Sequence, residues 1–163
     1  MAFADKIAEN KRIAEKCMEM KAYNAGVTRA YYSAFLRIKG YLIDKEFDYD
    51  GFLQQKGLGD KAFSHGTIQA AVTTCLMANG KKAVDVYKLH VLNTMYYKRR
   101  KADYEEENIL DFELESSLKD LDIVLSVVAW FTEVFMFDKN YFFFFAASIA
   151  SIKSCPQMER YFL

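Results

Sequence analysis

A chain of 163 residues with 52% hydrophobic and 16% aromatic content can bury one sizeable core, so we expect a single main domain. The 22 lysines and arginines balance 22 aspartates and glutamates, which excludes an overall field that attracts nucleic acid, an anionic membrane or an acidic substrate. Any basic site must therefore be a local patch.

The cysteines and the first residues bear on the cellular compartment. Cys17, Cys75 and Cys155 are an odd number at wide spacings, which argues against a disulfide framework and against a thiolate zinc site. Residues 1–12 mix acids with lysines and resemble the start of a helix rather than a signal peptide. We therefore expect reduced thiols and a cytoplasmic location.

Apolar spacing predicts two helices in the first part of the chain. One is expected from Phe3 to about Tyr23, and its buried face comprises Ile7, Ile13, Ala14, Cys17 and Met20 or Lys21. The next is capped by Asn24, and its apolar positions are Val27, Tyr31, Ala34 or Phe35, Ile38 and Leu42. Residues 44–63 lose this periodicity and gather glycine and charge, as expected of a loop.

The remaining helices follow the same logic. A third begins at Ser64 or His65, buries Ile68, Ala71, Val72, Cys75 and Leu76, and ends at Asn79 and Gly80. A fourth runs from Lys82 to about Arg100, with one side comprising Val86, Leu89 or His90, Asn93 and Tyr97. The cleanest stripe is the last one, formed by Leu114, Leu118, Leu121, Leu125 and Val128.

This pattern predicts an all-α fold, an up-and-down bundle of four to five helices over residues 1–138. The aromatic tail, 139–163, is expected to pack on the bundle or on a partner, because its four consecutive phenylalanines would aggregate in water. Charged residues interrupt the apolar region 123–152, and its unbroken part, 141–152, is shorter than the roughly 20 residues of a membrane span. We expect no membrane insertion.

Most enzyme signatures are missing from the sequence. There is no glycine-rich phosphate loop, no H-E-x-x-H motif and no G-x-S-x-G elbow. His65 and His90 are too few for a histidine-rich metal site, and Cys75 falls on an apolar helix face. We expect neither a metal nor a cofactor.

Two polar stretches are not explained by core packing. Arg29, Ser33 and Arg37 recur every four residues, and they form either a solvated face or a functional ridge. Four consecutive basic residues, 98–101, precede Asp103 and Tyr104. They are either a cationic helix end or part of a binding site.

Both stretches resemble the HEPN family. The run "NAGVTRAYYSAFLRIKGYL", residues 24–42, is similar to the second-helix signature of that family, and "RRKADY", residues 99–104, resembles its arginine, two residues, alanine, aspartate, tyrosine motif. The likeness covers roughly residues 3–128. It implies a helical bundle, commonly a homodimer, in a family of RNA-cleaving toxins, defence proteins and noncatalytic modules often encoded beside a minimal nucleotidyltransferase.

The ribonuclease branch of that family uses an arginine and a histidine with four to six residues between them, and the histidine serves acid-base chemistry. Here Tyr104 and three glutamates, 105–107, occupy those positions after Arg99 and Arg100. Whether the chain is an enzyme is therefore left open.

Taken with the resemblance, these residues predict a ligand site. Guanidinium groups would bind phosphate and tyrosine rings would stack on a base in one cleft formed by Arg29, Tyr31, Tyr32, Arg99, Asp103 and Tyr104. The alternative is structural, with Asp103 pairing Arg29 or Arg99 to lock two helices together. Lys98 and Lys101 are expected to point elsewhere and to be solvated.

The functional prediction is a cytoplasmic HEPN-like toxin-antitoxin or defence protein that recognises RNA or a nucleotide. The alternative is a noncatalytic adaptor that binds a nucleotidyltransferase or another protein through the aromatic tail. The resemblance and the aromatic surplus also predict a homodimer of about twice the 18.9 kDa chain mass.

Overall fold

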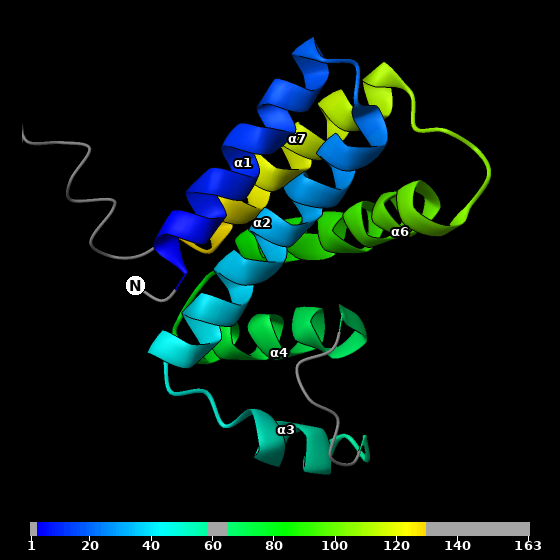
Figure 1. Cartoon of the computed structure of the whole chain (residues 1–163). Helices are drawn as coiled ribbons and strands as arrows, with labels where there is room; N and C mark the ends of the chain where they lie inside the picture. The colour runs from blue at the N-terminus through cyan, green and yellow to red at the C-terminus, as the bar shows by residue number, and fades with distance from the viewer. Residues whose placement is uncertain (1–2, 59–64, 130–163) are drawn as a thin grey trace, which may run out of the picture. The chain divides into compact units, whose positions relative to one another are not determined.

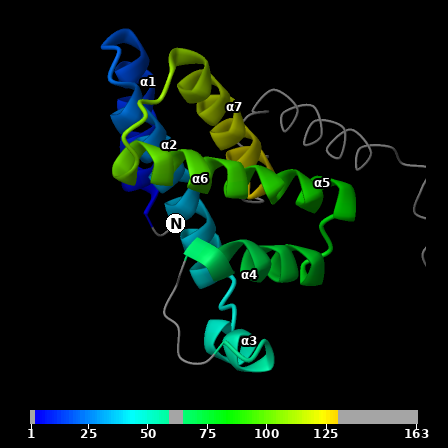
Figure 2. The ribbon, with the colours of Figure 1, turned by 90° about the vertical axis from the view of Figure 1, so that its right-hand side faces the viewer.

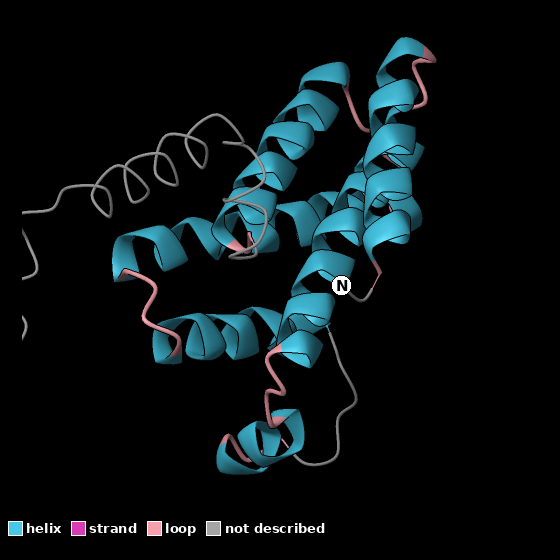
Figure 3. Cartoon of the chain, turned by 90° about the vertical axis from the view of Figure 1, so that its left-hand side faces the viewer, coloured by secondary structure: helices cyan, strands magenta, loops and turns pink. Residues whose placement is uncertain are grey.

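The computed structural model describes residues 3–58 and 65–129, of which 81% are helical and none forms a strand (Figure 3). This confirms the predicted all-α class. One compact unit comprises Met1–Val128. The predicted boundary at Asp138 and the aromatic tail, 139–163, lie outside the described residues.

Five helices of 14 or more residues make up most of this unit, in line with the predicted four to five. They are α1 (Ala4–Glu19), α2 (Tyr23–Asp44), α4 (His65–Ala78), α6 (Val91–Tyr104) and α7 (Asp111–Val127). Shorter pieces are α3 (Tyr49–Gln55), α5 (Ala83–Tyr87) and a 3₁₀ turn, η1 (Lys88–His90).

Helix α2 is the centre of the bundle. It contacts α1, α4, α6 and α7. Figures 1 and 2 show α1 and α7 running alongside α2, whereas α4 and α6 cross it. The expected apolar positions of α2 are buried, namely Val27, Tyr31, Ala34, Ile38 and Leu42. Because α2 has neighbours on several sides, its polar side chains are also drawn into the interior.

Ser33 and Arg37 show this most directly, because both are buried. The Ser33 hydroxyl donates to the backbone oxygen of Ile7 in α1 at 2.9 Å, and Arg37 Nε donates to the oxygen of Val128 at 3.0 Å. Of the predicted polar ridge, only Arg29 is exposed. The two deeper members bond the backbone of neighbouring helices, as buried polar groups must.

The closest approach in the core occurs at Gly26 of α2. A Cβ atom there would lie 2.5 Å from Leu114 Cδ2 of α7 and 3.0 Å from the Cβ of Cys17 in α1. Leu114 is fully buried, so it has little room to move away. The absent side chain is therefore what lets three helices meet around the cluster of Cys17, Val27, Ile109 and Leu114.

Two local predictions were wrong. The segment expected to be a loop contains α3, which the Asp48 carboxylate caps by accepting from Gly51 N at 2.9 Å. Asn24 is not the cap of α2, because that helix already begins at Tyr23. The Asn24 amide oxygen instead accepts from Ile109 N at 2.8 Å, which ties the loop before α7 to the start of α2.

The 3₁₀ turn η1 interrupts the fourth predicted helix, and the residues that face the core differ from the expected ones. Val86 and Leu89 are buried as expected, but Asn93 is exposed and Tyr97 is 68% exposed. In α6 the buried side chains are those of Val91, Leu92 and Met95 instead.

Within residues 3–58 and 65–129, no helix is long and apolar enough to cross a membrane. Most of the apolar region 123–152 lies outside these ranges, so the prediction of no membrane insertion is tested only for the described helices.

Candidate functional site

The predicted pair Arg99 and Asp103 lies on one face of α6, as their four-residue spacing requires. Arg99 Nε is 2.7 Å from Asp103 Oδ2. The Nε–H bond is not directed at that oxygen, so the contact is an ion pair without a well-aligned hydrogen bond. Side-chain exposure is 13% for Arg99 and 27% for Asp103, which leaves the carboxylate the more accessible of the two.

Both members of the pair are held by α2. Arg99 Nη2 donates to the Tyr32 hydroxyl at 3.3 Å, and the Thr28 hydroxyl donates to Asp103 Oδ1 at 2.8 Å. The Arg99 guanidinium also lies 5.7 Å from the ring centre of Tyr32 and 5.3 Å from that of Tyr104, within range for cation–π attraction. Four of the six predicted site residues thus form one connected cluster.

These neighbours stabilise the protonated form of Arg99. Burial lowers the pKa of Arg99, but a hydrogen bond with Tyr104 and the proximity of Tyr32 and Asp103 raise it by more, so the net shift is upward. The guanidinium therefore stays protonated at every physiological pH.

An open groove of about 280 Å³ lies beside this cluster. Its walls are formed by Asn24, Ala25, Thr28, Arg29, Tyr32, Ala102 and Asp103. Arg29 is exposed, and its Nη1 donates to the neutral Asn10 amide at 3.3 Å. Among the described residues Arg29 has no ion pair. Arg29 rather than Arg99 is therefore the cation with uncompensated charge at this groove.

Tyr31, the sixth predicted residue, is 2% exposed and its hydroxyl lies 2.5 Å from Nδ1 of His65. Burial raises the pKa of Tyr31 far above its usual range, so this hydroxyl keeps its proton. Burial, and then the charge of Arg99, lower the pKa of His65. The imidazole is thus neutral at pH 7, and its tautomer decides which of the two groups donates in this contact.

The His65 ring is surrounded by aromatic residues. Its centre lies 4.7 Å from Phe35, 5.3 Å from Tyr31 and 5.6 Å from Tyr96, on which it stacks. Tyr31 therefore positions the first residue of α4 and is not available to stack on a ligand. This aromatic cluster links α2, α4 and α6 behind the groove.

An NMR titration of the two histidines tests this electrostatic arrangement. We expect His65 to titrate below 6.5, and we expect Arg99→Ala to move its pKa upward because a nearby positive charge is removed. Since the folded state disfavours protonation, the stability contributed by His65 is present above pH 6.5 and is lost as the pH falls through its lowered pKa. A titration of His65 at or above 6.5 would contradict the arrangement.

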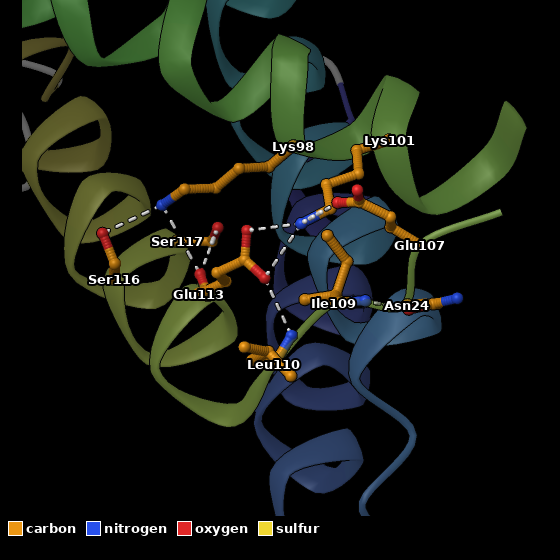
Figure 4. A network of polar contacts seen from close by, with 9 residues as sticks. All are labelled: Asn24, Lys98, Lys101, Glu107, Ile109, Leu110, Glu113, Ser116 and Ser117. Carbon is orange, nitrogen blue, oxygen red and sulfur yellow. Dashed lines mark hydrogen bonds and ion pairs between the residues drawn. The ribbon is translucent and has the colours of Figure 1, made fainter. Parts of the chain in front are cut away.

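The expectation that Lys98 and Lys101 are solvated was wrong, as Figure 4 shows. Lys98 Nζ donates to the Ser116 hydroxyl at 2.9 Å and lies 3.8 Å from Asp120 Oδ2, with both charged side chains 15% exposed. Lys101 Nζ lies 3.3 Å from the Glu113 carboxylate. Both lysines therefore join α6 to α7, because positions 98 and 101 are three apart and share the face of α6 that meets that helix.

Glu113 also organises the start of α7 (Figure 4). Its carboxylate accepts from Leu110 N at 2.9 Å, as in half of a capping box. The four basic residues 98–101 thus make different contacts. Two lysines make interhelical ion pairs, Arg99 faces α2, and only Arg100 is left exposed.

Sequence reasoning missed three residues that build the site. Thr28 anchors Asp103, Asn10 contacts Arg29, and Tyr96 stacks on His65. Tyr96, Arg99 and Asp103 share a face at i, i+3 and i+7, and Thr28 and Tyr32 do so at i and i+4. These spacings could have been used to place Tyr96 and Thr28 at the site. No pattern in the sequence indicates the contact of Arg29 with α1.

Among the described residues no group of three or more histidine, cysteine or acidic side chains is arranged to hold a metal ion. No protein-family model matches the chain, and no curated protein matches it.

Proposed function

We propose that this chain is a HEPN-like toxin-antitoxin or defence protein that binds RNA or a nucleotide in the groove between α2 and α6. The observation that carries the proposal is the position of Arg29. Its guanidinium is exposed at a groove that Tyr32 and Asp103 also line, and it forms no ion pair with any residue in 3–58 or 65–129.

The chemistry of the groove suits a ligand that has both a phosphate and a base. Arg29 offers a planar fork of N–H donors, which matches phosphate oxygens. Tyr32 offers a ring already fixed by Arg99 on α6, and Tyr104 adds a second ring that is 70% exposed. Aromatic rings beside cations are the usual features of sites that bind single-stranded nucleic acid.

Binding is the proposed activity, and cleavage is a separate question. His65 stacks on Tyr96 beside the cluster, but its Nδ1 is engaged by the Tyr31 hydroxyl and its pKa is lowered. A lowered pKa makes the imidazole a weaker base, and a ring nitrogen bonded to Tyr31 is not available to take a proton from a ligand. The function proposed is therefore recognition.

Incubation of the purified chain with labelled single-stranded RNA and with nucleotides, with and without Mg²⁺, tests the proposal. Binding should be detected, and Arg29→Ala should weaken it about ten- to hundredfold, as expected for the loss of a charge-assisted contact of about 1.5–3 kcal/mol. The melting temperature should stay unchanged because Arg29 is exposed.

The matched control is Arg12→Ala, which removes another exposed arginine from the neighbouring helix α1, outside the residues that line the groove. This variant should bind as the wild type does. Equal losses in both variants would indicate nonspecific attraction, and no binding by the wild type would refute the proposal.

A further inference from the structure

We infer that Asp103 makes this groove selective for guanine, either in a free nucleotide or at the end of an RNA strand. The inference rests on the proposed binding of RNA or nucleotides at the same groove. It concerns the one acidic side chain in a groove that otherwise suits an anionic ligand.

A carboxylate beside a phosphate site needs an explanation, because it repels the phosphate. Asp103 lines the groove with its side chain 27% exposed. Its two oxygens are each held once, Oδ1 by the Thr28 hydroxyl at 2.8 Å and Oδ2 by Arg99 Nε at 2.7 Å. The carboxylate is therefore fixed in position before any ligand arrives.

Fixing the carboxylate does not exhaust its capacity to accept hydrogen bonds. An ionised carboxylate has about four lone-pair sites, so about two remain after the contacts with Thr28 and Arg99, one on each oxygen. The two oxygens belong to one planar carboxylate, so each offers an acceptor close to the other. A ligand that fits them must offer two neighbouring donors with parallel N–H bonds.

Guanine meets this requirement better than the other bases. Its Watson–Crick edge offers the N1–H and the N2 amino group next to each other, whereas adenine and cytosine offer one amino group and uracil one N–H. A bidentate pair of this kind discriminates strongly between bases. A base that offers a single donor leaves one of the two acceptors of Asp103 without a bond to the ligand.

The position of Arg29 fits the same ligand. Arg29 follows Thr28 in α2, and Thr28 is bonded to Asp103 of α6, so the cation and the carboxylate both line the groove, one from each helix. A guanine nucleotide has an anion at one end and paired donors at the other. Tyr32 of α2, whose ring centre is 5.7 Å from the Arg99 guanidinium, supplies a ring surface for the base.

Isothermal titration of the purified chain with GMP, IMP and AMP tests the inference, together with short RNA strands that end in guanosine or adenosine. GMP should bind about ten- to hundredfold more tightly than AMP. IMP retains N1–H but lacks the N2 amino group, so its affinity should fall between the two. A preference seen only with RNA strands would assign the site to RNA ends, and one seen with GMP would assign it to free nucleotides as well.

Asp103→Asn is the decisive variant, because it preserves the shape of the side chain but replaces one acceptor oxygen with an amide NH2 group, which is a donor. It should bind GMP and AMP alike, and Asp122→Asn on α7, whose carboxylate pairs with Lys11 away from the groove, should keep the guanine preference. Equal binding of GMP and AMP by the wild type overturns the inference and leaves the proposed function standing. Absence of any binding overturns both. Should Asp103→Asn fail to fold, the wild-type comparison of GMP with AMP still decides.

Discussion

Arg99→Ala is expected to lower both the melting temperature and the affinity for RNA or a nucleotide. The substitution leaves the Asp103 carboxylate without its cation and removes the hydrogen bond to Tyr32. Losing a charged contact of this kind costs about 1.5–3 kcal/mol, which corresponds to a fall of roughly 3–12 °C in a domain of this size. Affinity should fall about tenfold or more because Tyr32 and Asp103 lose their positions.

Arg100→Ala provides a matched control for this experiment. Arg100 is adjacent in the sequence but exposed, so its removal should change the melting temperature little. The two measurements separate the alternatives for the pair. A lower melting temperature with unchanged affinity would mean that Arg99 and Asp103 only lock α6 to α2. Wild-type values for both would show that the site is assigned wrongly.

The sequence, together with the HEPN resemblance, grouped Arg99 and Asp103 with Tyr32 and Tyr104, and these four side chains do lie together. A spacing of four residues puts two side chains on one helix face whatever the tertiary structure, so the pairing of Arg99 with Asp103 could be predicted. Lys98 and Lys101 lie on another face of α6, and no pattern in the sequence indicates that α7 covers that face.

The helices themselves were largely predictable because their apolar periodicity is strong. In α4 all five expected core residues are buried, and the helix ends at Asn79 and Gly80 as expected, with Gly80 at φ 78°. The short helix α3 was missed because seven residues give too little periodicity to detect among glycines and charges. Its cap, Asp48, was the only local signal.

The roles of Tyr31 and His65 could not be predicted from their spacing. Their contact joins residues 34 positions apart and exists only because α4 crosses α2. The sequence indicated that Tyr31 belongs to the apolar stripe, and it also placed Tyr31 among the ligand-binding residues. The buried position agrees with the first of these interpretations, since a ring with 2% exposure has no free face.

Arg37 shows that the exposure of side chains on a central helix cannot be predicted from the spacing within that helix alone. Arg29, Ser33 and Arg37 lie on one side of α2. Their exposure falls along the helix, from the exposed Arg29 to the buried Arg37. At the buried end α7 terminates, and its last carbonyl groups need donors. Arg37 supplies one, and a cation at the C-terminus of a helix is also favoured by the helix dipole.

Arg37→Ala is accordingly expected to destabilise the fold strongly, by about 3 kcal/mol or more. The change removes a charged hydrogen bond to Val128 O, worth about 1.5–3 kcal/mol, and leaves a cavity where a 4% exposed side chain was packed. In a domain of this size the melting temperature should fall by at least about 6 °C. Thermal unfolding followed by circular dichroism measures it.

Arg37→Met separates the two causes, because methionine restores most of the volume but donates no hydrogen bond. Its loss of stability should lie between those of the wild type and Arg37→Ala, and below its melting temperature it should bind RNA or nucleotides as the wild type does. The exposed Arg12→Ala variant should melt as the wild type does. If Arg37→Ala retained wild-type stability but lost ligand affinity, the ridge would be functional along its whole length, and the structural role assigned to its buried end would be wrong.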